Sequence, residues 1–142
     1  MDFILINNDI AQFLPSFGAA IVIGRPGTIR ASGASSFNGK KVCVEGDEDS
    51  VQVQGCMYTS GAFVIPGTGT LKIAALGGNQ TAQHTRSGGK KMLLKGSMFQ
   101  AKFEVLSPAQ QPSAAGPIPD PMPQYTGGQG QFITTNTKYK GT

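Results

Sequence analysis

The chain has 142 residues, of which 20 are Gly, nine are Pro and 14% are charged, and it contains no Trp. Such a composition is typical of chains dominated by turns and short strands, and it argues against long helices. The formal net charge of +4 permits weak attraction to nucleic acid, but the basic residues are dispersed, so nucleic acid is not the partner we expect.

The hydropathy pattern predicts neither a membrane-spanning helix nor a signal peptide. The longest apolar stretch, residues 17–23, is far shorter than the roughly 20 residues that a spanning helix needs. The first residues, Met1 to Ile6, lack the basic start and the small-residue cleavage site of a secretory signal. We therefore expect synthesis in the cytoplasm and no stable insertion into a membrane.

Taken in chain order, the apolar residues recur mostly at every second position, which is typical of half-buried strands. A first strand at 3–6 precedes one predicted helical turn over 8–14, which Pro15 would end. Further strands are predicted at residues 19–23, 28–31, 41–45, 51–54, 62–65, 70–75, 91–95 and 98–105. The clusters of Gly, Pro, Asn, Asp and Ser between them predict short antiparallel hairpins and an all-β fold.

Two echoes within the chain predict a degenerate duplication. Val22-Ile23 with Gly27-Thr28 recurs as Val64-Ile65 with Gly69-Thr70, and Gly39-Lys40-Lys41 with Gly46 recurs as Gly89-Lys90-Lys91 with Gly96. The repeat-like units would span about 19–47 and 62–97. Neither unit could bury its apolar face alone, so we expect the two to pack into a compact cone-like or barrel-like module.

The composition changes after residue 106. Residues 107–142 are rich in Pro, Gln and Gly, and such a segment cannot build a core by itself. We therefore predict a β domain over residues 1–106 and an extended C-terminal arm over residues 107–142. Residues 131–135 could add one more strand, so we expect the arm to lie along the domain or on a partner.

Candidate metal ligands and catalytic groups are few. Cys43, Cys56 and His84 are the Cys and His residues of the chain, whereas a structural zinc site usually takes four ligands. Zinc therefore stays an open hypothesis, with Cys56 and His84 as the candidate ligands. A Cys–His catalytic pair has no supporting constellation, and the Gly residues form no phosphate-binding motif. We predict that the protein is not an enzyme.

Residues 37–47, Phe-Asn-Gly-Lys-Lys-Val-Cys-Val-Glu-Gly-Asp, resemble the "N-G-K-x-x-A-x-x-G-D" strand and turn of PAAR-repeat proteins. Upstream, Ile23-Gly24-x-Pro26-x-Thr28-Ile29 is similar to that family's "I-x-x-G-S-P-T-V". The same order partly returns at residues 64–71 and 91–97, so the resemblance covers residues 19–105. The turn and repeat positions are Gly27, Thr28, Gly39, Gly46, Asp47, Gly69, Thr70, Gly89 and Gly96.

The resemblance implies a β cone that caps the trimeric β-helical spike of a contractile injection system, such as a type VI secretion system or a phage-like tail. Such tips pierce the target membrane mechanically and can carry effector cargo, so the protein would work within an assembled, exported or virion-associated particle. The family typically binds a metal through three His and one Cys. This chain has one His, and only Cys56 stands where such a ligand belongs.

Two other classes of function remain open from the residues. One is a self-assembling virion, tail or coat protein, a homo-oligomer whose arm, residues 107–142, contacts neighbours. The other is a small nucleic-acid-binding β barrel, in which Phe99 and Phe103 would be interleaved with Lys95 and Lys102. Alternation places these aromatic rings on the core side rather than on a binding face.

Overall fold

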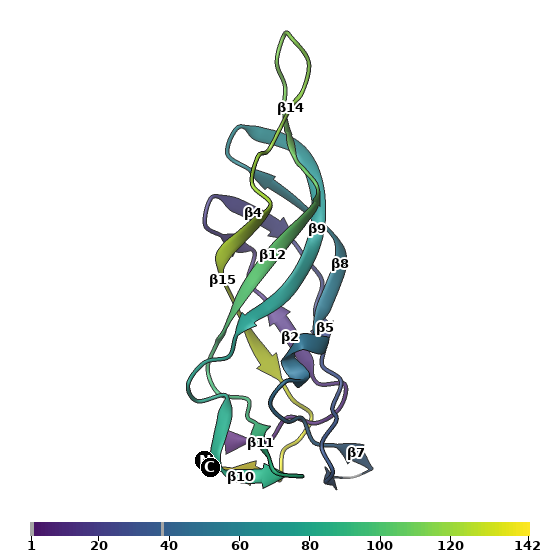
Figure 1. The fold of residues 1–142 in the computed structure, drawn as a ribbon, viewed down its shortest axis with the longest axis vertical. Helices are drawn as coiled ribbons and strands as arrows, with labels where there is room; N and C mark the ends of the chain where they lie inside the picture. Colours follow the sequence, from purple (N-terminus) through teal and green to yellow (C-terminus); the bar gives the residue numbers. More distant parts are fainter. Residues whose placement is uncertain (1, 38) are drawn as a thin grey trace.

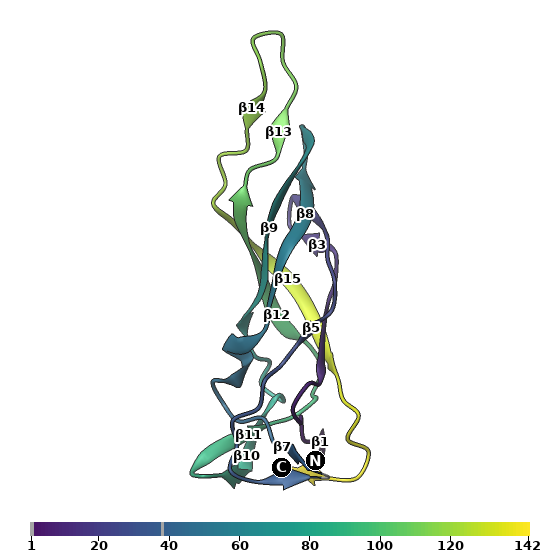
Figure 2. The ribbon, with the colours of Figure 1, turned by 90° about the vertical axis from the view of Figure 1, so that its right-hand side faces the viewer.

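The computed structural model describes residues 2–37 and 39–142. Their regular structure is almost entirely antiparallel β, with one 3-10 turn, η1 (Asp47–Ser50). The molecule is elongated and tapers from a wide end, where both termini lie, to a narrow end formed by the loop that joins β13 (Gln110–Gln111) to β14 (Ile118–Pro119) (Figures 1 and 2). The prediction of a compact all-β module is thus confirmed.

A ten-stranded sheet runs along the long axis and curls around its own core (Figure 1). The strands follow the order β3-β4-β8-β9-β12-β15-β2-β5, and β13 joins β9 and carries β14. Besides β13 and β14, the members are β2 (Ile10–Phe13), β3 (Ser16–Phe17), β4 (Ala20–Ile23), β5 (Gly27–Thr28), β8 (Gln52–Ser60), β9 (Phe63–Ala75), β12 (Phe99–Ser107) and β15 (Gln124–Ile133).

Three small two-stranded ribbons form the wide end (Figure 2). They pair β1 (Asp2–Phe3) with β16 (Lys140–Gly141), β6 (Ser36–Phe37) with β7 (Lys40–Lys41), and β10 (Thr81–Ser87) with β11 (Lys90–Leu93). The first ribbon joins the two ends of the chain. The wide end is therefore assembled from residues that are far apart in sequence.

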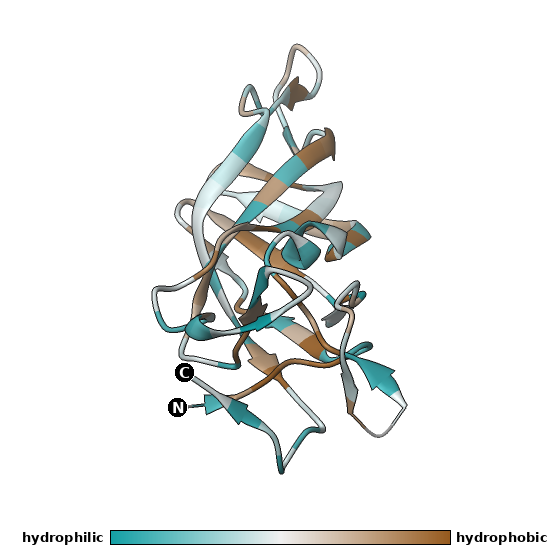
Figure 3. Ribbon diagram, turned by 60° about the horizontal axis from the view of Figure 1, so that its bottom comes forward, coloured by the Kyte–Doolittle hydropathy of each residue, from teal (hydrophilic) through white to brown (hydrophobic). Residues whose placement is uncertain are grey.

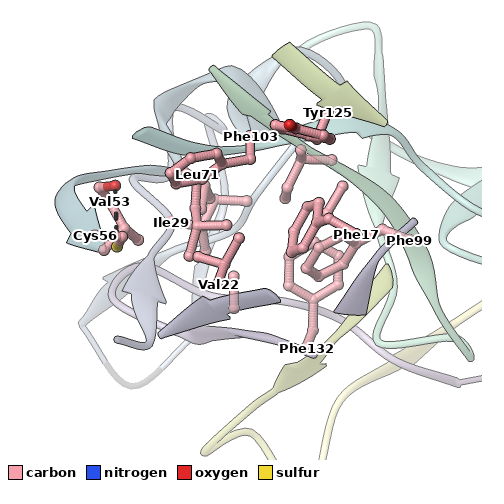
Figure 4. Close-up of a cluster of buried hydrophobic side chains, with 14 of the residues drawn as sticks. Phe17, Val22, Ile29, Val53, Cys56, Leu71, Phe99, Phe103, Tyr125 and Phe132 are labelled. Carbon is pink, nitrogen blue, oxygen red and sulfur yellow. Dashed lines mark hydrogen bonds between the residues drawn. The ribbon is translucent and has the colours of Figure 1, made fainter. Parts of the chain in front are cut away.

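Aromatic rings fill the space that the curled sheet encloses (Figure 4). Phe17, Phe99, Phe103 and Phe132 are fully buried, and neighbouring rings meet edge-on or tilted, as in Phe99 and Phe132 with centroids 4.9 Å apart. Alternating burial along β12 and β15 directs every second side chain into this core.

The predicted helical turn over residues 8–14 is wrong. Residues 10–13 form β2, which pairs with β15 on one side and with β5 on the other. Ala11 is fully buried while Ile10 and Gln12 are exposed, which is strand alternation. Pairing with partners that are distant in sequence outweighs the local helical pattern.

Residues 107–142, which we predicted as an extended arm lying along the domain or on a partner, supply a central strand of the main sheet. β15 lies between β12 and β2 in the sheet, and Phe132 belongs to the core. A Cβ at Gly128 or Gly130 would overlap the rings of Phe17 and Phe99. The glycines that make this segment look like a linker are therefore the positions where core rings lie against the backbone.

A buried carboxylate ties the narrow end to the sheet. Asp120 is 4% exposed and accepts hydrogen bonds from the hydroxyls of Tyr58, at 2.8 Å, and Tyr125, at 2.5 Å. The Tyr58 hydroxyl also accepts the Ala109 N–H, at 3.0 Å. Burial raises the pKa of Asp120, but the hydrogen bonds from Tyr125, Met122 and Tyr58 outweigh it, so the pKa lies below the usual Asp value.

Candidate docking face at the wide end

Three segments of the chain, residues 3–7, 41–45 and 91–95, meet beneath the main sheet in a closed ring of hydrogen bonds. We call them the triad. The Leu5 N–H donates to Leu93 O, at 3.0 Å, Leu93 N–H donates to Cys43 O, at 2.9 Å, and Cys43 N–H donates to Leu5 O, at 2.9 Å. Each segment therefore donates to one neighbour and accepts from the other, as a threefold arrangement requires.

A second ring of contacts joins the three segments in the same cyclic way. Hydrogen bonds of 2.9 Å run from Asn7 N–H to Lys41 O, from Glu45 N–H to Lys91 O and from Lys95 N–H to Phe3 O. Three isolated antiparallel bridges complete the set: Ile4 with Leu94, Ile6 with Val42, and Val44 with Met92. Each of these hydrogen bonds and bridges between two segments thus has a counterpart between the other pairs of segments, so the wide end has pseudo-threefold symmetry.

The central residues of the three segments are Leu5, Cys43 and Leu93, and all three are fully buried in the main core. Burial, with smaller effects from Asp47 and Asp9, raises the pKa of the Cys43 thiol well above its usual value. This cysteine therefore stays protonated and packs as a small apolar side chain.

Each segment ends in the same turn. Asn8, Gly46 and Gly96 follow the segments at equivalent positions and have φ values of 69°, 99° and 54°, the left-handed region that Gly and Asn tolerate best. In two copies an aspartate closes the turn, because Asp9 accepts the Ile6 N–H at 2.7 Å and Asp47 accepts the Val44 N–H at 2.9 Å. The third copy has Ser97 instead, and its Leu94 N–H donates to Gln80 O, at 2.9 Å.

The three ribbons extend the triad outward with one common register. Lys41 pairs with Ser36, Lys91 with Arg86 and Phe3 with Lys140, each two residues before the centre of its segment. Figure 3 views these ribbons from the wide end, with hydrophilic strands around the more hydrophobic triad. Two ribbons close through turns at Gly39 and Gly88-Gly89, and the chain termini occupy the equivalent place in the third.

The wide end also gathers positive charge. Six of the twelve basic residues lie in the ribbon strands, against one acidic residue, Asp2; the six are Lys40, Lys41, Arg86, Lys90, Lys91 and Lys140. The ion pairs within residues 2–37 and 39–142 join Lys72 and Lys102 to Glu104 in the middle of the molecule. None of the six ribbon cations has a carboxylate partner in that part of the chain.

The residues of the repeat motif fall into two groups in the structure. Gly39, Gly46, Gly89 and Gly96 occupy equivalent turns of the wide end, and Asp47 closes one of them through Ser32 and Val44. The remaining four occupy different places in the main sheet: Gly27 and Thr28 form β5, while Gly69 and Thr70 lie within the long β9.

The residues suggested as metal ligands do not come together. Cys56 is buried on β8, where its thiol donates to Val53 O at 3.5 Å (Figure 4), whereas His84 is exposed on β10 at the wide end. The described residues contain no group of three or more His, Cys, Asp or Glu able to hold a metal ion. The side chains present therefore do not fit the three-His, one-Cys site that the resemblance implies.

Sequence reasoning missed the first copy of the triad. Ile4-x-Ile6-x-Asn8-Asp9 has the same pattern as Val42-x-Val44-x-Gly46-Asp47, with Asn in place of Gly. That spacing of apolar residues before a left-handed residue and an aspartate was the available signal.

Within the described residues, no helix is long and apolar enough to cross a membrane.

The chain was compared with known proteins and protein families. A search of curated proteins found no match. A family model described as "Contractile injection system spike tip protein" matches residues 1–142. Because this match covers the whole chain, the protein belongs to the family of contractile injection system spike tip proteins.

Proposed function

We propose that this protein is a membrane-piercing cap that docks through its wide end on a trimeric β-helical spike. The observation that carries the proposal is the cyclic set of hydrogen bonds joining Leu5, Cys43 and Leu93. A single chain with a threefold end can present similar surfaces to three identical subunits, which matches the closed symmetry of a trimer. The spike of a type VI secretion system or of a phage-like tail has the symmetry required.

The orientation follows from the shape. If the wide end meets the spike, the β13–β14 loop points away from it and leads the particle (Figure 2). The Asp120 carboxylate holds this end through Tyr58 and Tyr125, so the leading hairpin is fixed rather than a free loop. We infer a mechanical rather than a catalytic role, in which effector cargo would be carried by the same particle.

The charge of the ribbons supports a partner with acidic side chains at its end. Lys40 and Lys90 occupy equivalent places in two ribbons, and neither has a carboxylate partner within the described residues. Facing carboxylates on the spike would offset this concentration of like charge and speed association.

The test is light scattering on the purified chain, alone and mixed with the trimeric spike protein encoded with it. We expect a monomer that joins the trimer at one copy per three spike chains. A concentration-dependent homo-oligomer that ignores the spike would refute the cap and favour a lattice protein. The matched control is a spike trimer from an unrelated contractile system.

A further inference from the structure

The charged residues are distributed unevenly along the long axis. Residues 10–24, 51–71 and 105–133 contain one charged residue, Asp120. These stretches form much of the main sheet from just above the wide end up to the narrow end (Figure 1): β2, β3, β4, β8, the first part of β9, the end of β12, β13, β14 and β15. We call this surface the neutral surface.

The single charge on the neutral surface is hidden. Asp120 is 4% exposed, and two tyrosine hydroxyls and the Met122 N–H occupy its carboxylate oxygens. At the boundary of the surface, the charge of Glu104 is balanced by Lys72, at 2.6 Å. Arg25, which is exposed and donates from its guanidinium to Gln54 O, is the charge that borders this surface at β8. The rest of the surface presents no exposed charge that would have to be stripped of water.

Exposed apolar side chains concentrate on the same surface. Eleven of the thirteen large hydrophobic side chains that the structure exposes belong to it, namely Ile10, Leu14, Ile21, Ile23, Met57, Val64, Ile65, Leu106, Ile118, Met122 and Ile133. Ile23, which is 74% exposed, pairs across strands with Met57, and Ile118 on β14 pairs with Gln111 of β13 next to Ile65. Exposed apolar side chains that are neighbours, such as Ile23 and Met57, form the kind of patch that marks a contact surface.

We propose that the neutral surface contacts the acyl chains of a lipid bilayer directly, with Ile118 and Ile23 entering the apolar layer. The inference rests on the proposed piercing function and names its ligand as neutral lipid rather than an acidic headgroup. Charged side chains are the costliest residues to bring into hydrocarbon, whereas aliphatic side chains favour it. The contact is reversible, because the short edge strand β3 leaves backbone groups that hydrocarbon cannot satisfy.

The chain contains no Trp, so a single introduced Trp reports its own surroundings. Ile118→Trp and Ile23→Trp place the probe on the neutral surface, and His84→Trp places it on an exposed site at the wide end. With vesicles of pure phosphatidylcholine, we expect the first two variants to show shorter-wavelength emission and quenching by brominated acyl chains. The His84→Trp variant should show neither change.

A second substitution tests the role of neutrality. Adding Ile118→Lys to the Ile23→Trp variant should lower vesicle partitioning by at least about tenfold. Adding Gln83→Lys at the exposed wide end should leave partitioning unchanged, which makes it the matched control. All these sites are exposed, and far-ultraviolet circular dichroism checks that the fold is kept.

Two results would overturn the lipid contact. One is an absence of spectral change in both neutral-surface variants. The other is an equal change in the His84→Trp variant that requires anionic lipid, which would mean adsorption through the ribbon cations. The cap itself is tested separately, because Ile118→Lys should still join a spike trimer at one copy per three chains. Loss of docking with unchanged vesicle binding would refute the cap and leave the lipid contact standing.

Discussion

Replacing Gly46 and Gly96 separately by Ala should distinguish backbone strain from steric overlap at two equivalent turns of the triad. Both residues have positive φ, where a Cβ costs about 1–2 kcal/mol. A Cβ at Gly46 would meet nothing within 4 Å, whereas a Cβ at Gly96 would lie 2.5 Å from Gln80 Cγ and 2.8 Å from Asn79 O. Overpacking adds about 1–3 kcal/mol. The free energy of unfolding should therefore fall by about 1–2 kcal/mol in G46A and by about 2–5 kcal/mol in G96A.

The assay is equilibrium unfolding in urea, with the slope of free energy against urea concentration compared between variants. Gly116→Ala is the matched control, since Gly116 also has positive φ and open space around it but lies in the β13–β14 loop. The Gly116→Ala variant should lose as much free energy of unfolding as G46A. A loss in G46A that equals or exceeds the loss in G96A would refute the assignment of these glycines to strain and close packing respectively.

Three further predictions concern charge and the narrow end. The affinity for the spike should fall as salt is added. The double reversal Lys40→Glu with Lys90→Glu should lower that affinity most at low salt. An affinity that does not change with salt in titration calorimetry would contradict this role of charge. Because the folded-state pKa of Asp120 is lowered, its stabilisation is complete above the ordinary Asp pKa and is lost as pH falls through the lower value. Urea unfolding measured between about pH 6 and pH 2 should show that loss. In Asp120→Asn, the free energy of unfolding should depend less steeply on pH. Tyr58→Phe should lower the free energy of unfolding by about 1–3 kcal/mol and should speed amide hydrogen exchange over residues 107–124. Unchanged exchange there would mean that the Asp120 carboxylate does not hold the narrow end to the sheet.

The strands that could be predicted are those in which apolar and polar residues alternate, the pattern of a strand with one buried face. Phe99, Ala101 and Phe103 alternate with polar residues, and β12 indeed buries this face against the core. β2 was missed, because Ile10 and Phe13 also fit one face of a helical turn. Only the pairing with β15 and β5 decides between the two structures, and that pairing is not visible locally.

β15 was hard to predict for a different reason. Its side of the core is filled by rings from other strands, so the strand itself needs Gly128 and Gly130 rather than large apolar residues. A segment of this kind has the composition of a linker, although Tyr125 and Phe132 are buried within it. Composition therefore records what a segment contributes to the core and not whether it lies beside the core.

Two copies of the triad were found through their glycines, and the copy at residues 3–7 was missed. Gly39-Lys40-Lys41 and Gly89-Lys90-Lys91 repeat because both ribbons close through tight turns. The copy at residues 3–7 has no such turn, since Phe3 pairs with Lys140 at the other end of the chain. Its left-handed residue is Asn8 rather than Gly, so a search guided by glycines does not find it.

The central residues of the triad lie on its pseudo-threefold axis, and substituting one of them tests whether the wide end is a rigid base. Cys43 is fully buried beside Leu5 and Leu93, and its thiol makes no hydrogen bond within the described residues. Cys43→Ala removes only a small apolar group, for a loss of about 1 kcal/mol, whereas Cys43→Ser buries a hydroxyl without a partner at a further cost of about 1–3 kcal/mol. Urea unfolding should therefore rank the Ser variant below the Ala variant, and both should still dock on the spike where they remain folded. The opposite ranking would mean that the axis is hydrated, and a hydrated axis would not support the three segments as one rigid docking face.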